Sequence, residues 1–117
     1  MSFEESIKDL LESCPGARGA AIVDPDGIPV AVSPEDGSLE VLGAELAAVL
    51  HDLAEAAREL KHGQLEQCSV FAEHAVIILT TIAAGYFLVL VLGRDGSAGR
   101  ARFQSRVARS RLYSEFI

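Results

Sequence analysis

The residue types that most often carry chemistry are few in this chain and poorly spaced for it. Two of the histidines, His51 and His62, fall on one predicted helix about 16 Å apart by helical rise, too far to bind one metal ion. The cysteines, Cys14 and Cys68, form no Cys-x-x-Cys pair and have no histidine at a recognised interval. The segment 96–99 has glycines but lacks the lysine of a phosphate-binding loop. We therefore predict no catalytic residue, no metal site and no cofactor, and a protein that is not an enzyme.

The composition is that of a globular protein with an acidic surface. Of the 117 residues, 50% are hydrophobic and 23% are charged, and the net charge is −7. This balance argues against nucleic-acid binding, because the phosphate backbone would be repelled. The length is that of one domain, so we expect residues 1–117 to form a single domain. The N-terminus shows no signal-peptide pattern and the two cysteines make no disulfide framework, which predicts a cytoplasmic protein.

The charge is unevenly distributed along the chain. Residues 1–93 carry four basic and fifteen acidic side chains, whereas residues 94–117 carry six arginines and two acids. Three of the arginines, Arg102, Arg106 and Arg109, fall within about 60° of each other on a predicted C-terminal helix. Such a stripe could bind an acidic partner, a lipid headgroup or a nucleotide phosphate. The alternative is a solvated face that the chain's own carboxylates partly neutralise.

An uncharged stretch from Ala75 to Gly93 is long enough to suggest a membrane span. Its two halves, 75–82 and 86–92, are rich in β-branched and aromatic residues, and Ala83-Ala84-Gly85 separates them. That pattern is typical of two buried strands joined by a short turn. We therefore predict a β-hairpin here and no membrane insertion.

Capping and turn signals divide the rest of the chain into helices and strands. Ser2 and Glu5 form a capping box, Asp24-Pro25-Asp26-Gly27 is a turn, and Pro29 marks its strand as an edge strand. The predicted elements are a helix that begins at the capping box and ends before Cys14, strands over 18–24 and 28–33, a helix over 39–62, strands over 64–73, 75–82 and 86–92, and a helix over 99–116. The order α-β-β-α-β-β-β-α predicts a mixed α/β (α+β) fold.

The long helix over 39–62 carries two contrasting stripes. Leucines recur every seven residues from Leu39 to Leu60, and we expect this stripe to face the protein's own sheet. Beside it, Gly43, Ala47 and Ala54 form a seam of small residues that would let a second helix approach closely. The alternative is that alanine, a good helix former, fills a half-exposed face.

The ordered series of elements resembles a known family. The residues from Gly16 to Val32 read GARGAAIVDPDGIPVAV, which resembles the first hairpin of Roadblock domains, the class of the roadblock-type dynein light chains. The Leu/Ala-rich helix, the strand at 65–71, the hairpin at 75–93 and the closing helix continue the resemblance over almost the whole chain. It implies a five-stranded antiparallel sheet in the order 2-1-5-4-3, with the long helix on one face and the terminal helices on the other.

The resemblance also implies assembly and function. Roadblock domains are homodimers in which the long helices pack antiparallel and the third strands pair, and they are typically non-enzymatic partners of small Ras-like GTPases, as in the bacterial MglB type. No nucleotide or metal site is implied. On this basis we expect a dimer interface at Gly43, Ala47, Ala54, Leu65, Gln67, Cys68 and Val70. We expect a partner-binding face at Glu45, His51, Asp52, Glu55, Arg58 and Glu59, with Arg102, Arg106 and Arg109 as a second candidate contact.

Two function classes therefore compete. The first is a dimeric regulator or scaffold that activates or anchors a small Ras-like GTPase. The second is a small-molecule-sensing α/β/α binding domain, which needs polar groups that converge on core-facing strand positions. The interior hairpin offers only Thr80, Thr81 and Tyr86 for that purpose, so the first class is favoured.

Overall fold

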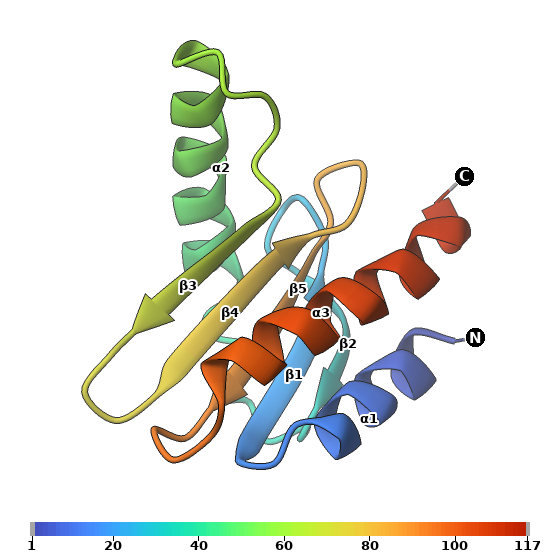
Figure 1. The fold of residues 1–117 in the computed structure, drawn as a ribbon. Coiled ribbons are helices and arrows are strands. Elements are labelled where there is room, and N and C mark those ends of the chain that lie inside the picture. The colour runs from blue at the N-terminus through green and yellow to red at the C-terminus, as the bar shows by residue number, and fades with distance from the viewer. Residues whose placement is uncertain (1, 117) are drawn as a thin grey trace.

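The computed structural model describes residues 2–116, which form three α-helices and one sheet. The elements are α1 (Phe3–Ser13), β1 (Ala17–Val23), β2 (Pro29–Ser33), α2 (Gly43–Glu59), β3 (Gln67–Phe71), β4 (Val76–Thr81), β5 (Phe87–Leu92), α3 (Ala98–Tyr113) and a 3-10 helix (Ser114–Phe116). The strands are antiparallel in the order β2-β1-β5-β4-β3. Helix α2 lies on one face of the sheet and α1 and α3 lie on the other (Figure 1). The fold class and the strand order expected from the resemblance are confirmed.

Local hydrogen bonds explain where the first elements begin and turn. The Ser2 hydroxyl accepts a hydrogen bond from the Glu5 backbone N–H at 3.1 Å, which caps the N-terminus of α1. Between β1 and β2, the Asp24 carboxylate accepts from the backbone N–H groups of Asp26 and Ile28, both at 2.9 Å. These two side chains fix the helix start and the hairpin turn that the sequence predicts.

The uncharged stretch forms the β4–β5 hairpin, as predicted. The two strands pair from Val76 opposite Leu92 to Thr81 opposite Phe87, in the centre of the sheet. Their side chains are mostly buried, because both faces of these strands are covered by helices. In residues 2–116, no helix has both the length and the apolar character needed to cross a membrane.

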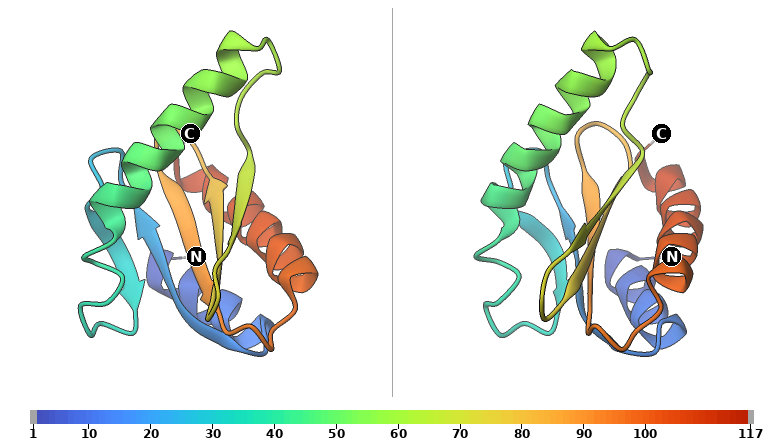
Figure 2. Two further views of the ribbon diagram at one scale, coloured as in Figure 1. Left: turned by 90° about the vertical axis from the view of Figure 1, so that its left-hand side faces the viewer. Right: turned by 60° about the vertical axis from the view of Figure 1, so that its left-hand side comes forward.

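The sheet carries an apolar layer on each face, and the two layers are covered unequally. Alternate residues of β4 illustrate the division: Ile78 packs toward α1 and α3, whereas Leu79 packs toward α2. Two helices lie along the first face, whereas among residues 2–116 α2 alone lies on the second, and it extends beyond the strand ends (Figure 2). Part of the second face is therefore left open beside α2.

The sheet has two edges, and they differ. Strand β2 is one edge and contains Pro29, in agreement with the expectation that this proline marks an edge strand. Strand β3 is the other edge and pairs only with β4 among the described residues. The outer side of β3 has no proline that would block pairing with another strand.

The long helix is shorter than predicted. It was expected over 39–62 but begins at Gly43 and ends at Glu59. Turns precede it, in which the Asp36 carboxylate accepts hydrogen bonds from the backbone and the hydroxyl of Ser38; these bonds lower the pKa of Asp36. Leu39 is buried in this segment ahead of the helix, so it contributes to the core from a turn and not from a helical stripe.

Candidate interaction surface

The side of α2 that faces the sheet is lined by small residues. Gly43 is buried and lies against the backbone carbonyl of Gly27, where a Cβ atom would overlap that oxygen. Ala47 packs on the apolar layer beside Leu50, and Ala54 lines a cleft beneath the helix. The small-residue seam expected to receive a second helix is therefore turned toward the chain's own sheet. Gly27 covers the side of Gly43 that faces the turn, and the contact of Gly43 with a partner stays a prediction.

The leucines at the C-terminal end of α2 are exposed, which overturns the prediction that their stripe faces the sheet. Leu53 and Leu60 are 40% and 66% exposed, and Val49 is 48% exposed. The close approach of Gly43 to Gly27 sets the rotation of the helix, and the distal turns pass beyond the strands (Figure 1). We call the following side chains the apolar flank of α2: Leu42, Leu46, Val49, Leu53, Ala56 and Leu60.

The apolar flank has the spacing of a helix-pairing seam. Its residues alternate at intervals of four and three, the a and d pattern that buries one helix against another. Leu42 and Leu46 are half-buried against the chain's own sheet, whereas the residues from Val49 onward are exposed. A continuous apolar stripe exposed to solvent is typical of a surface that binds another protein.

The part of the sheet next to α2 that no helix covers is also apolar. Cys68 and Val70 of β3 pair with Leu79 and Ile77, so their side chains point to the α2 side of the sheet. Val70 is 38% exposed, and Ile77 is only partly covered. The apolar flank and the α2 side of β3 thus border the same uncovered region, next to the unpaired edge of β3.

The other predicted interface residues divide between this surface and the interior. Leu65 is half-buried against the α2-side layer, close to the start of β3. The side chain of Gln67 lies on the opposite face, where it donates hydrogen bonds to Thr80 Oγ1 and to the Arg102 carbonyl, both at 3.0 Å. Gln67 can therefore contribute only its backbone to pairing at the β3 edge.

The predicted partner-binding side chains all lie at the surface of α2. His51 and Glu55 are within 3.3 Å of each other, one helical turn apart. Each member of the set is exposed: Glu45, His51, Asp52, Glu55, Arg58 and Glu59. With four carboxylates among six charged or titratable groups, this face would attract a basic surface.

Two of the three arginines in the stripe on α3 hydrogen-bond to neighbouring strands, while Arg106 remains exposed. Arg106 Nη1 donates to Gln67 Oε1 at 3.2 Å, and Arg109 Nε donates to the Thr81 carbonyl at 2.7 Å. Thr80 and Thr81, the groups considered for a ligand pocket, are thus used within the chain. The residues that Arg106 and Arg109 bond to lie 39 and 28 residues away in the sequence, so these bonds could not be predicted. The i, i+4, i+7 spacing of the arginines was the one feature of the sequence that singled them out.

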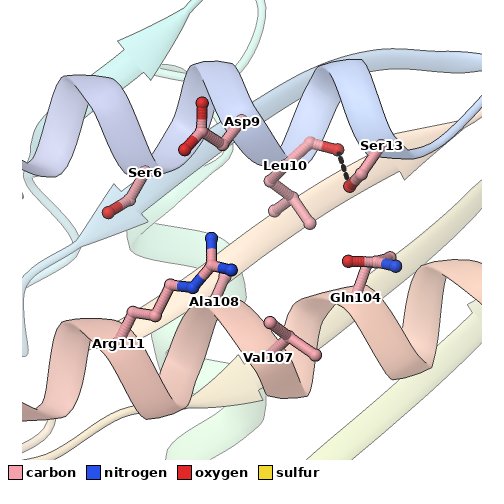
Figure 3. A pocket seen from close by; sticks show the side chains of 8 residues that line it. All are labelled: Ser6, Asp9, Leu10, Ser13, Gln104, Val107, Ala108 and Arg111. Atoms are coloured by element: carbon pink, nitrogen blue, oxygen red, sulfur yellow. Dashed lines mark hydrogen bonds between the residues drawn. The ribbon is translucent and has the colours of Figure 1, made fainter.

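A small hollow between α1 and α3 does not qualify as a ligand site. Figure 3 shows its side chains, with the Ser13 hydroxyl donating to the Leu10 carbonyl and Arg111 reaching from α3 toward α1. Its volume of about 170 Å³ is below the roughly 300 Å³ at which small-molecule pockets begin. Within residues 2–116, no cluster of His, Cys, Asp and Glu could hold a metal ion.

Comparison with known proteins assigns this fold to a family. A family model described as the Roadblock/LC7 domain matches residues 4–92. The chain belongs to the Roadblock/LC7 family. Members of this family are regulatory or adaptor proteins rather than enzymes. Among curated proteins, no sequence matches the chain.

Several solved structures resemble this chain over nearly its whole length. A Roadblock/LC7 domain from Streptomyces avermitilis has a TM-score of 0.89 at 15% identity and covers 99% of this chain and 98% of its own. Myxococcus xanthus MglB has a TM-score of 0.85 at 15% identity, with 99% and 98% covered. Myxococcus xanthus MglC is 31% identical with a TM-score of 0.70, and 98% and 99% of the two chains are covered. The first two likenesses concern the fold, whereas MglC also shares sequence.

Proposed function

We propose that this Roadblock/LC7 protein is a non-enzymatic, dimeric regulator or scaffold of a small Ras-like GTPase. Family membership supports the regulatory class, since the resemblance to Roadblock domains implies partners of this kind. The likeness to MglC, at 31% identity over 98% of the chain, supports a bacterial regulator. The observation that carries the proposal is the uncovered surface made by the apolar flank of α2 and the open edge of β3.

A second copy of the chain is the occupant that best fits this surface. Two apolar flanks could pack against each other in a coiled-coil manner, because each presents the a and d spacing. Two β3 edges could pair at the same time, which would close both edges instead of propagating a longer sheet. The dimer expected from the resemblance would thus form through Leu53, Leu60 and β3.

The GTPase would contact the polar outer side of the paired α2 helices. This side is turned away from the sheet and carries the exposed acids Asp52, Glu55 and Glu59. Their charge would speed the encounter with a basic surface and orient it. Because exposed charges are screened beyond a Debye length, complex formation should weaken as the salt concentration rises.

Binding to a GTPase whose reading frame neighbours that of this chain tests the proposal. Isothermal titration calorimetry should detect a complex with either the GDP-loaded or the GTP-loaded form. The double variant Asp52→Lys/Glu55→Lys should bind at least about tenfold more weakly, because two attractive charges become repulsive. The matched control is Glu4→Lys/Glu12→Lys, which makes the same charge change at exposed positions of α1 on the other side of the sheet.

The possible results test separately whether a GTPase binds, whether net charge governs binding, and whether the contact lies on α2. If the wild-type dimer binds neither nucleotide form of any neighbouring GTPase, the assigned function is wrong. Equal loss of affinity in the α1 control would mean that net charge, and not the α2 face, governs binding. If the α2 variant binds like the wild type, the contact lies elsewhere, and Arg102, Arg106 and Arg109 become the next surface to test.

A further inference from the structure

A basic cleft opens between α3, the start of β3 and the segment 60–66. Its volume is about 510 Å³, within the range of small-molecule sites. The polar groups that line it include Arg106, Arg109, Ser110, His62, Gln67 and Glu66. The cleft belongs neither to the apolar flank of α2 nor to the acidic outer side of that helix, so the proposed GTPase function does not use it.

The two guanidinium groups in the cleft are held by neutral acceptors. Arg109 donates through Nε to the Thr81 carbonyl at 2.7 Å and lies 5.7 Å from the centre of the Tyr113 ring. Its two Nη groups donate to no protein atom within residues 2–116. Arg106 donates through Nη1 to Gln67 Oε1 at 3.2 Å, which leaves its other N–H groups open to the cleft.

Gln67, the first residue of β3, lines the cleft and links it by hydrogen bonds to β4 and α3. Its amide nitrogen donates to Thr80 Oγ1 and to the Arg102 carbonyl, so its amide oxygen is left as the acceptor for Arg106. Thr80 is completely buried, so this hydrogen-bond network is anchored in the core. Arg106 therefore hydrogen-bonds to a side chain that β3 and β4 hold in place, although Arg106 itself is exposed.

The positive charge in this cleft lacks an ion-pair partner in the described part of the chain. No carboxylate lies at ion-pair distance from Arg106 or Arg109, and α3 itself contains no acidic residue. Glu66 is the one acid among the lining residues, and it is exposed. In a protein of net charge −7, two arginines that line one cleft with no carboxylate at ion-pair distance among the described residues are suited to binding an anion.

We infer that this cleft binds the phosphate group of a small phosphomonoester, or inorganic phosphate itself. Two planar guanidinium groups can each donate two hydrogen bonds to a tetrahedral dianion, whereas one of them would satisfy a carboxylate. His62 places an imidazole in the same cleft, whereas the Ser110 hydroxyl already donates to the Arg106 carbonyl at 3.2 Å. The anion would replace water at the guanidinium N–H groups, and no covalent bond would form or break.

Titration of the purified chain, without any GTPase, tests this inference. Inorganic phosphate and glycerol 3-phosphate are added at low ionic strength and followed by calorimetry and by backbone amide NMR shifts, with glycerol as the uncharged comparison. Both phosphates should bind and shift residues around the cleft, whereas glycerol should not. Arg106→Gln and Arg109→Gln should each lower the affinity about tenfold, since each removes charge-assisted hydrogen bonds.

Matched variants distinguish binding at this cleft from nonspecific attraction of anions to the positively charged helix α3. Arg111→Gln removes the same charge from the other flank of α3 and should leave the affinity unchanged. Glu66→Gln should raise the affinity a few-fold because it removes the one acid lining the cleft, and a gain cannot result from misfolding. Thermal unfolding of each variant identifies any loss of affinity that reflects instability, and Arg109→Lys should retain more affinity than Arg109→Gln.

Three results would overturn the inference. The first is the absence of saturable binding of either phosphate. The second is an equal loss of affinity in Arg111→Gln and Arg106→Gln, which would indicate a diffuse charge effect. The third is binding to phosphatidylglycerol vesicles without binding to soluble phosphates, which would assign the arginines to a lipid surface.

Discussion

Gly43, the first residue of α2, lies directly against the backbone carbonyl of Gly27 in the turn between β1 and β2. Gly27 has φ of +87° and in turn packs against the backbone of Ala44. Two chain segments can approach this closely only where neither carries a side chain. The contact anchors the N-terminus of α2 on the sheet and so determines which side of the helix remains uncovered.

Substitution Gly43→Ala should destabilise the protein by about 1–3 kcal/mol, because the added methyl group overlaps the Gly27 carbonyl and forces the helix away from the turn. Thermal or urea-induced unfolding measures the effect. Gly99→Ala is the matched control: it lies in the first turn of α3, where a Cβ meets only ordinary contacts. That variant should be neutral or slightly stabilised. Equal stability of the two variants would contradict the tight contact.

The apolar flank leads to a prediction about assembly. Leu53→Glu should convert a dimer into a monomer, because the carboxylate would be buried without a partner between two helices. Sedimentation equilibrium should give twice the 12.4 kDa chain mass for the wild type and the single chain mass for the variant. Ala48→Glu introduces the same side chain at an exposed position off the apolar flank and should remain dimeric. A wild-type monomer at micromolar concentration would contradict the proposed interface.

The hydrogen bond between Gln67 and Thr80 leads to a prediction about stability. Gln67→Ala leaves the fully buried Thr80 hydroxyl without this partner and should destabilise the fold by about 1–3 kcal/mol. Thr80→Val removes the unsatisfied hydroxyl, so the double variant should lose less than the sum of the two single losses. Urea unfolding of the four proteins in this double-mutant cycle measures the coupling. Strict additivity would show that the two side chains act independently.

The family assignment leads to a prediction about chemistry. The purified protein should release no phosphate from GTP or ATP above the rate in buffer, because the chain has no phosphate-binding loop with its lysine. A sensitive phosphate-release assay with and without Mg²⁺ measures this. A cooperative thermal unfolding transition of the same sample serves as the control for its integrity. Turnover that scales with protein concentration and persists through repeated purification would show that the protein is an enzyme.

The order of the elements could be predicted because their signals are local. Asp24 and Gly27 make their turn with neighbouring residues, and Ser2 caps its helix with a residue three positions away. The uncharged run from 75 to 93 was identified as a hairpin by its β-branched residues and its central glycine. Each of these features depends on contacts within a few residues, which a sequence displays directly.

The orientation of the long helix on the sheet could not be predicted from local patterns. The periodicity of the helix revealed two stripes, but which of them faces the sheet depends on the contact between Gly43 and Gly27, residues from different elements. The leucines were assigned to the core because large apolar residues are usually buried. Gly43, Ala47 and Ala54 share that side with Leu50, whereas Leu53 and Leu60 are exposed, since the close contact at Gly43 sets the rotation of the helix.

Local patterns along the chain were sufficient to predict the order of the elements, the family and the uneven distribution of charge. Packing of the helices on the sheet determines which side of α2 is exposed, and it brings Arg106 to Gln67 and Arg109 to the Thr81 carbonyl. The physical reason is the range of the interactions. Turns, caps and periodicity arise between near neighbours, whereas an uncovered helix flank and a cleft are made by residues that meet only when the sheet and its helices pack.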